Sequence, residues 1–308
     1  MKTTKKPRPA NLALRTGHLG PHLHHADDRF LHDTWIAMDE MPLRVPEDTG
    51  DNALTVNGHN ENILPICVRL AARVNAFLET ESSTPLLKAV QEQTRAALGV
   101  ISTALERYSL EEISLSYNGG KDCLVLLILL LCALAKYEKG PVPKALATVY
   151  IISPHPFAEV DAFVDESAIM YKLDLARYAM PMKQGFQQYL EDHKKVKAIL
   201  VGTRRTDPHG QSLTHFDQTD SGWPSFMRVH PVIDWHYAEI WAFIRRLEIP
   251  YCPLYDQGYT SLGGTTDTHP NPALKAGDGQ SNDSKAQVFK PAYELMEDNA
   301  ERLGRDWI

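Results

Sequence analysis

The feature that most constrains the fold is a pair of adjacent glycines between a short alternating segment and a long apolar run. Residues 113–116 alternate apolar and small polar side chains, as a short strand does. Residues 124–131 are apolar at every position, which suits a buried helix and is too short for a membrane span. Gly119 and Gly120 therefore lie at a strand-to-helix turn. Such a turn gathers free backbone N–H groups at the positive end of a helix dipole, which favours a bound phosphate.

The glycine loop does not match two common phosphate-binding patterns. The P-loop pattern would need a glycine at position 115, where Leu115 stands, and a Ser or Thr directly after Lys121. The dinucleotide pattern GxGxxG places one residue between its first two glycines, whereas here they are adjacent. Taken alone, the segment could also be a turn that merely joins a strand to a buried helix.

Composition narrows the class of protein. The 308 residues suit one large domain or two small ones, and 43% hydrophobic residues allow a sizeable core. The net charge of −7 and the lack of a long basic stripe argue against nucleic acid as a partner. The cysteines stand at no zinc-like spacing and are expected to be free thiols in a reducing compartment: Cys67, Cys123, Cys132 and Cys252.

The N-terminal region offers little structure to interpret. Residues 1–60 show little periodicity, and we expect a poorly ordered or loosely packed extension before one domain at 61–308. The first apolar run, residues 12–14, is too short for a signal peptide. We expect a cytoplasmic protein without a membrane partner, a monomer or weak dimer. The basic, acid-free segment 1–26 leaves a mitochondrial pool open.

Helices and strands are predicted to alternate along most of the domain. Two helices come first, at 61–79 and from Pro85 to about 108, the second with Thr84 as N-cap. Strands are then expected at 113–116, 145–152, 175–179 and 198–201, and helices at 121–137, 158–173 and 183–193. Repeated β-α units imply an α/β, Rossmann-like fold, with a mainly parallel sheet and helices on both faces.

Beyond Asp207 the pattern changes to a C-terminal extension of loops and short helices. We expect a loop at 217–224, an extended segment at 226–233, a helix at 238–247 and a short helix within 292–308. Residues 276–287 hold few apolar side chains and are predicted to be mobile.

Two carboxylates are expected at the carboxyl ends of the strands, where ligands of such sheets bind. Asp122 follows the glycine loop and Asp207 follows the fourth strand. Beside a polyphosphate they would suit Mg²⁺. Each also has a simpler role, because Asp122 can stabilise a helix N-terminus and Asp207 can form an Asx turn before Pro208. Of Arg204 and Arg205, one is expected to point inward and the other to be solvated.

Several motifs together resemble the eukaryotic, fungal-type FAD synthases of the PAPS reductase-like, adenine-nucleotide α-hydrolase group. They follow one another from about residue 60 to the end, which is more specific than any single motif. Members usually carry Ser where this chain has Cys123, so one hydroxyl donor to the phosphates is missing. The motifs are Ser116–Cys123, Gly202–Pro208, Thr219–Pro224, His230–Trp235, Gly258–Gly264, Asn271-Pro272 and Glu301–Arg305.

The resemblance implies an FMN adenylyltransferase that converts FMN and Mg·ATP to FAD and pyrophosphate. Catalytic roles are expected for Asn118, Asp122, Asp207, Arg302 and Arg305, with Asp122 and Asp207 at the metal. The expected ATP site comprises Ser116, Tyr117, Asn118, Gly119, Gly120, Lys121, Asp122, Arg204 and Asp207. The expected FMN site comprises Arg302 and Arg305, with Trp223 and Tyr259 as aromatic candidates for the isoalloxazine ring, and Tyr255 as a further one.

Two alternatives remain open. A PAPS reductase-like oxidoreductase would need a nucleophilic cysteine near the C-terminus, whereas the last cysteine, Cys252, stands well before it in Tyr-Cys-Pro-Leu. A non-catalytic nucleotide-binding module of the same fold is less expected, since Asn118, Asp122 and Asp207 are intact.

Overall fold

The computed structural model describes residues 62–276 and 288–306. The expected extension at 1–60 lies outside these residues, and so does nearly all of the segment predicted to be mobile. Within the described residues one sheet has six strands in the order β3-β2-β1-β4-β6-β5. Their bounds are Ile113–Ser116 (β1), Leu146–Ile151 (β2), Leu173–Tyr178 (β3), Ala198–Leu200 (β4), Phe216–Gln218 (β5) and Met227–Val229 (β6).

The sheet is parallel except at one edge. β1 lies at the centre, with Leu115 opposite Thr148 of β2 on one side and Leu200 of β4 on the other. β5 pairs with β6 in the antiparallel sense. The prediction of a loop at 217–224 is therefore wrong at its start, because Asp217 and Gln218 belong to this short edge strand.

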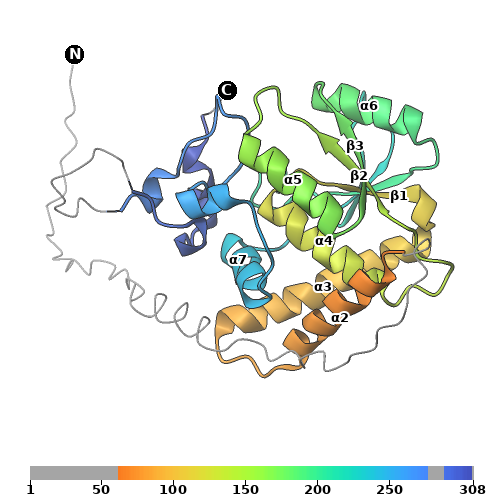
Figure 1. Ribbon diagram of the computed structural model, residues 1–308, viewed down its shortest axis with the longest axis horizontal. Helices are drawn as coiled ribbons and strands as arrows, with labels where there is room; N and C mark the ends of the chain where they lie inside the picture. The colour runs from red at the N-terminus through yellow and green to blue at the C-terminus, as the bar shows by residue number, and fades with distance from the viewer. Residues whose placement is uncertain (1–61, 277–287, 307–308) are drawn as a thin grey trace, which may run out of the picture. The chain divides into compact units, whose positions relative to one another are not determined.

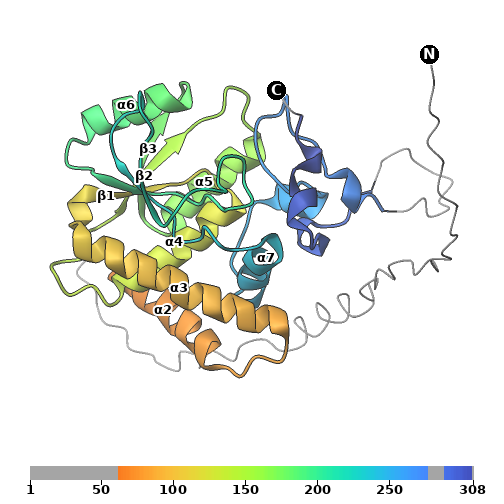
Figure 2. The same cartoon turned by 180° about the vertical axis from the view of Figure 1, so that it is seen from behind.

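Helices cover both faces, as predicted. α4 (Lys121–Leu134) joins β1 to β2, and α5 (Ala158–Met170) joins β2 to β3. Both connections run in the same direction across the sheet, so right-handed crossovers place them on the same face. α6 (Met182–Asp192) returns from β3 to β4 and covers the other face, as Figures 1 and 2 show.

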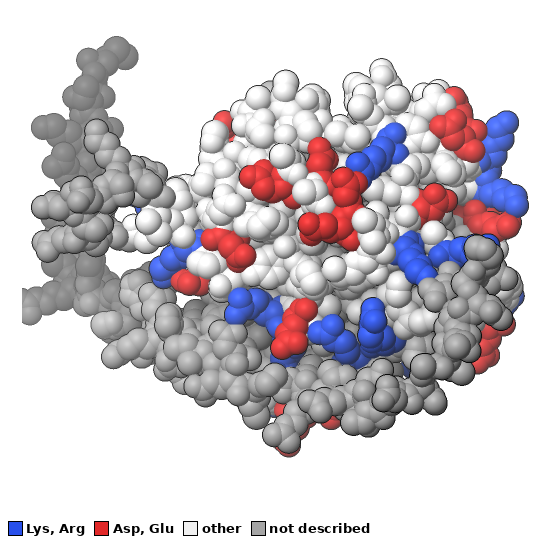
Figure 3. Space-filling model, in the orientation of Figure 1, with Lys and Arg blue, Asp and Glu red and all other residues white. Residues whose placement is uncertain are grey.

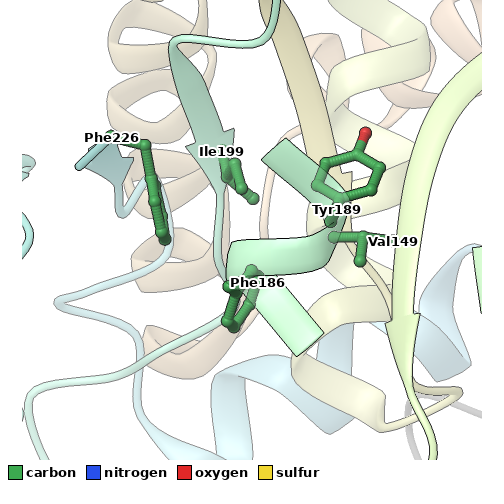
Figure 4. Packing of buried hydrophobic residues seen from close by; sticks show 5 residues of the cluster. All are labelled: Val149, Phe186, Tyr189, Ile199 and Phe226. Carbon is green, nitrogen blue, oxygen red and sulfur yellow. The ribbon is translucent and has the colours of Figure 1, made fainter. Parts of the chain in front are cut away.

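The face under α6 has its own hydrophobic cluster (Figure 4). Phe186 and Tyr189 of α6 pack with Val149 of β2, Ile199 of β4 and Phe226. Tyr189 is 0% exposed, and its hydroxyl donates a 2.6 Å hydrogen bond to Ser114 Oγ on β1. The cluster therefore fixes α6 against the strands whose carboxyl ends carry the candidate site.

On the opposite face α4 is enclosed by further helices. α2 (Leu64–Glu79), α3 (Pro85–Arg107) and α7 (Tyr237–Arg246) pack against it, and residues 124–131 are at most 1% exposed. α3 begins as predicted, with Leu87 N–H donating to Thr84 Oγ1 at 3.2 Å. Within the described part of the chain, no helix is both long and apolar enough to cross a membrane. The largely buried α4 gives the glycine loop a rigid base.

Several helices and strands begin or end at other residues in the structure than the sequence predicts. The helices predicted at 121–137 and 158–173 end at Leu134 and Met170, and the strand predicted at 175–179 already begins at Leu173. Only Met227–Val229 of the extended segment 226–233 forms a strand. The expected C-terminal helix is replaced by two 3-10 helices, Ala292–Glu294 and Asp298–Gly304, because the backbone between them is extended at Leu295 and Glu297.

Candidate active site

The glycine loop is shaped from within by Asn118. Its Oδ1 atom accepts hydrogen bonds from Gly120 N and from the Cys123 thiol, each at 3.0 Å. Gly119 has φ = 74°, in the left-handed region, and an added Cβ would lie 2.9 Å from Val164 Cγ2 of α5. Glycine is therefore required at this position both by conformation and by space. The thiol of Cys123 bonds within the loop, to Asn118 Oδ1 and to Gly120 O.

The first turn of α4 is held by two distant segments. The backbone N–H of Lys121 donates to the Tyr255 hydroxyl at 2.9 Å. The N–H groups of Asp122 and Cys123 also have no partner within the helix, as for any first turn. Gly202, after β4, lies so close that an added Cβ would be 2.7 Å from Cys123 N. The ends of β1 and β4 thus meet at one helix N-terminus.

A buried guanidinium lies at the centre of the site. Arg204 is 0% exposed, and its Nε atom is 2.9 Å from Asp122 Oδ1. Its Nη2 atom is 3.6 Å from Asp207 Oδ1 and also contacts Glu301. Arg205 instead is 41% exposed and pairs with Asp234 at 2.6 Å. Of the two adjacent arginines, Arg204 is therefore the inward one.

The Lys121 ammonium is also buried within this group of charges. It contacts Glu301 and lies 3.1 Å from Asp122 Oδ2, at 2% exposure. Asp298 adds a further carboxylate, 3.7 Å from Arg204 Nη1. Arg204 thus lies within 4 Å of four carboxylates, and Lys121 contacts two of the same four, those of Asp122 and Glu301. The ammonium of Lys121 therefore belongs to this buried group of charges, while its backbone N–H donates to Tyr255.

The two predicted metal ligands differ in their protonation equilibria. Burial opposes ionisation of Asp122, but the neighbouring Arg204 and Lys121 outweigh it and lower the pKa of this carboxyl group. The pKa of Asp207 is raised, because burial and the negative charge of Asp122 outweigh Arg204. Asp207 also caps the preceding turn, since its Oδ2 accepts from Arg204 N–H at 2.8 Å. The negative charges of the Asp122 and Asp207 carboxylates favour a bound cation beside them.

The C-terminal arginines approach the same edge of the sheet. Arg302 Nη1 is 4.0 Å from Asp207 Oδ1. Arg305 Nη2 is 3.3 Å from Asp267 Oδ2, and its guanidinium packs against the α-carbon of Gly263. In Figures 1 and 2 the C-terminal segments lie next to α5 and α7 in both views. The segment that carries both arginines is therefore folded back toward the glycine loop.

The aromatic candidates are dispersed. Tyr259 is half-buried and packs edge-on against Phe157, with ring centroids 5.4 Å apart. Trp223 is 40% exposed, on the β5–β6 loop. Among the described residues, neither ring shares a hydrogen bond, ion pair or ring contact with Arg302 or Arg305, so their contact with a flavin stays a prediction. Tyr255 is only 1% exposed, because it packs within the core and supports the loop instead.

Sequence reasoning missed Asp298 and Glu301, and it assigned Tyr255 to a flavin contact instead of to the loop. All three residues make polar contacts with the glycine loop or with Arg204. Glu301 opens the motif Glu301–Arg305, but no local pattern connects a single acidic residue with a lysine or an arginine far away in the sequence.

Comparisons with known proteins identify similar chains. The family model of the phosphoadenosine phosphosulfate reductase domain matches residues 112–189 and 176–270. A probable FAD synthase of Schizosaccharomyces pombe is 41% identical over 235 residues, which cover 75% of this chain and 85% of that protein. A probable FAD synthase of Caenorhabditis briggsae is 39% identical over 209 residues, covering 67% of this chain but only 38% of the longer nematode protein.

One solved structure is similar to this chain in its fold. The crystal structure of Candida glabrata FMN adenylyltransferase in complex with FAD and inorganic pyrophosphate superposes with a TM-score of 0.75 and 27% sequence identity. The match covers 82% of this chain and 99% of that one. The fold is therefore similar over 82% of this chain.

Proposed function

The chain belongs to the FAD synthase family, and we propose that it transfers the adenylyl group of ATP to the phosphate of FMN, which yields FAD and pyrophosphate. The observation that carries this proposal is the contact of Glu301 with Lys121 and Arg204. It brings the segment of Arg302 and Arg305 beside the glycine loop. A loop suited to a polyphosphate and arginines suited to a second phosphate are thus adjacent, as adenylyl transfer requires.

The reaction depends mainly on positioning FMN against ATP and on neutralising the charge of their phosphates. An oxygen of the FMN phosphate forms a new bond to the α-phosphorus of ATP, while the bond from that phosphorus to the leaving pyrophosphate breaks on the opposite side. Backbone N–H groups at the start of α4 would hold the leaving pyrophosphate. Arg302 and Arg305 would hold the attacking phosphate, which the polyphosphate otherwise repels. No nucleophilic side chain is needed.

The donor set at the loop fits Mg²⁺. Asp122 and Asp207 supply carboxylate oxygens, which this cation prefers together with phosphate oxygens. Within the described residues the buried Asp122 Oδ1 accepts no hydrogen bond, although it lies close to Arg204 Nε. We therefore propose Asp122 and Asp207 as the residues that hold the metal. When bound, Mg²⁺ would neutralise charge on the phosphates.

The cysteines argue against a reductase. Cys252 is 0% exposed, and burial raises the pKa of its thiol to about 11, which leaves little of the nucleophilic thiolate. Burial raises the pKa of Cys123 to about 12. Adenylyl transfer uses neither thiol. The oxidoreductase is therefore the less supported alternative.

We further propose that 61–308 forms one domain that acts on small nucleotides as a monomer or weak dimer in the cytoplasm. The four cysteines are free, which suits a reducing compartment. Figure 3 shows acidic groups near the middle of one face and both acidic and basic groups toward its edges. This mixed distribution does not favour nucleic acid.

The direct test is incubation of the purified protein with FMN and Mg·ATP, followed by chromatographic detection of FAD and by a pyrophosphate assay. We expect both products in equal amounts. Asp207→Asn should reduce turnover by about 100-fold or more, because it removes the proposed metal ligand. Asp234→Asn is the control, since Asp234 pairs with the outward Arg205. Reduction of PAPS without FAD formation would identify the oxidoreductase instead.

A further inference from the structure

One carboxylate joins the glycine loop to the segment after β4. Glu301 is 4% exposed, and its Oε1 atom contacts Lys121 Nζ while Oε2 contacts Arg204 Nη2. Lys121 begins α4 and Arg204 follows β4, so the two cations belong to different elements. Glu301 itself lies on the C-terminal 3-10 helix Asp298–Gly304. A single side chain thus connects three separate segments.

The backbone of Glu301 is held from the opposite side. Its carbonyl oxygen accepts a 2.5 Å hydrogen bond from the Thr260 hydroxyl. Asn271, which is 0% exposed, donates to Thr260 Oγ1 and to Ala300 O, each at 2.8 Å. The position of Glu301 is therefore fixed at both ends, by its carboxylate at the loop and by its carbonyl at the segment of Thr260 and Asn271.

We propose that Glu301 is a positioning residue that sets the adjacent Arg302 at a fixed place relative to the phosphate loop. The inference rests on the proposed adenylyl transfer, since it concerns the alignment of the two substrates. Arg302 is the next residue in the chain, and it approaches Asp207 at 4.0 Å. In-line attack is sensitive to misplacement by about an ångström, so this link should act on the chemical step more than on the binding of either substrate.

A purely structural role predicts a different pattern. Loss of a buried partner leaves Lys121 and Arg204 undercompensated, which destabilises a fold as a whole. In that case stability and the affinities for both substrates would fall together. A positioning role instead lowers kcat while the KM values for FMN and ATP change little.

The test compares Glu301→Gln with Glu297→Gln in the full-length protein. Glu297 stands at the N-cap position of the same 3-10 helix without a side-chain capping bond, and its side chain is exposed, so the chemical change is matched. For Glu301→Gln we expect kcat to fall at least ~10-fold with each KM within ~3-fold of wild type. Flavin fluorescence should report nearly unchanged FMN binding. Equal kcat values for the two variants, or a loss confined to KM, would overturn the inference.

A double-mutant cycle asks whether Glu301 acts through Arg302. Arg302→Ala should lower turnover strongly in the wild type and by a smaller factor in the Glu301→Gln background, because Arg302 is already misplaced there. If Arg302→Ala lowered turnover by the same factor in both backgrounds, Glu301 would not act through Arg302.

Two further outcomes are decisive. If Glu301→Gln does not fold, Thr260→Val replaces it, with Thr260→Ser as the control that keeps the hydroxyl donor to Glu301 O; only the valine variant should lose kcat, and equal values would reject the inference. If the wild type forms no FAD, the proposed function itself fails. If the wild type forms FAD and Glu301→Gln is as fast, only the positioning role fails.

Discussion

The Tyr255 hydroxyl oxygen accepts a 2.9 Å hydrogen bond from the backbone N–H of Lys121, the first residue of α4. Such an N–H has no partner inside its own helix. Tyr255 lies on the 3-10 helix Pro253–Gln257 and packs edge-on against Trp241 of α7, with ring centroids 5.0 Å apart. The aromatic core around Trp241 therefore holds the first residue of α4, directly after the two glycines.

Tyr255→Phe should weaken ATP binding while the ring packing remains. It removes one hydrogen bond worth about 1 kcal/mol, so the KM for ATP should rise roughly fivefold and the KM for FMN should change less. The matched control is Tyr251→Phe, because Tyr251 also packs on Trp241 but its hydroxyl bonds the exposed Asp256. Steady-state kinetics with each substrate varied measures the effect. An equal rise for both substrates would mean that the hydroxyl supports the fold and not the loop.

Gly202→Ala should displace the loop by steric overlap. An added Cβ would lie 2.7 Å from Cys123 N and 3.0 Å from Cys123 Cα, and these backbone atoms cannot rotate away. We expect a loss of about 1–3 kcal/mol in the free energy of unfolding and a marked loss of turnover.

The control for this variant is Gly99→Ala on the exposed side of α3. No atom lies within 4 Å of a Cβ added there, and alanine should stabilise the helix by about 0.5–1 kcal/mol. Urea unfolding of both variants gives the comparison. Similar shifts for the two would show that the contact between Gly202 and α4 is looser in solution.

The loop and α4 could be predicted from sequence because their signals are local. Alternation at 113–116, two glycines and an apolar run determine both elements within about two dozen residues, and the structure confirms β1 at Ile113–Ser116. β5 could not be predicted, since it has only three residues and two are polar. Its existence depends on pairing with β6, which is a tertiary effect.

The centre of the site was predictable only in part. Asp122, Asp207 and one of two adjacent arginines follow strand ends, and parallel strands bring such positions together. Glu301 is separated from Lys121 by 180 positions, and no periodicity connects a single acid with a single lysine over that distance. Ion pairs of this kind are found only when the packing of the C-terminal segment is known.

His230 should make stability depend on pH. It is 1% exposed, and burial, with the nearby Arg228, lowers its pKa to about 4, although Asp217 acts in the opposite direction. The unfolded chain therefore binds a proton near pH 6.5 that the native state rejects until about pH 4. Stability from this group is complete above pH 6.5 and is lost as the pH falls toward 4, by about 2–4 kcal/mol in total.

The check is urea unfolding of wild type and His230→Leu at pH 7 and pH 4.5. The wild type should lose about 2–3 kcal/mol more than the variant over this interval, whereas His155→Leu, at an exposed position, should behave like the wild type. Parallel losses in all three proteins would show that carboxylates alone cause the acid sensitivity.

Gly263→Ala should affect the FMN end without unfolding the protein. An added Cβ would overlap the guanidinium of Arg305, which is the movable end of a flexible side chain. Arg305 would shift away from Asp267, so the KM for FMN should rise by about fivefold or more while the KM for ATP and the melting temperature stay nearly constant. Gly140→Ala, in open space, is the control. Because both changes act on one guanidinium, Gly263→Ala should add little in an Arg305→Ala background. A full additional effect there would show that Gly263 acts on FMN independently of Arg305.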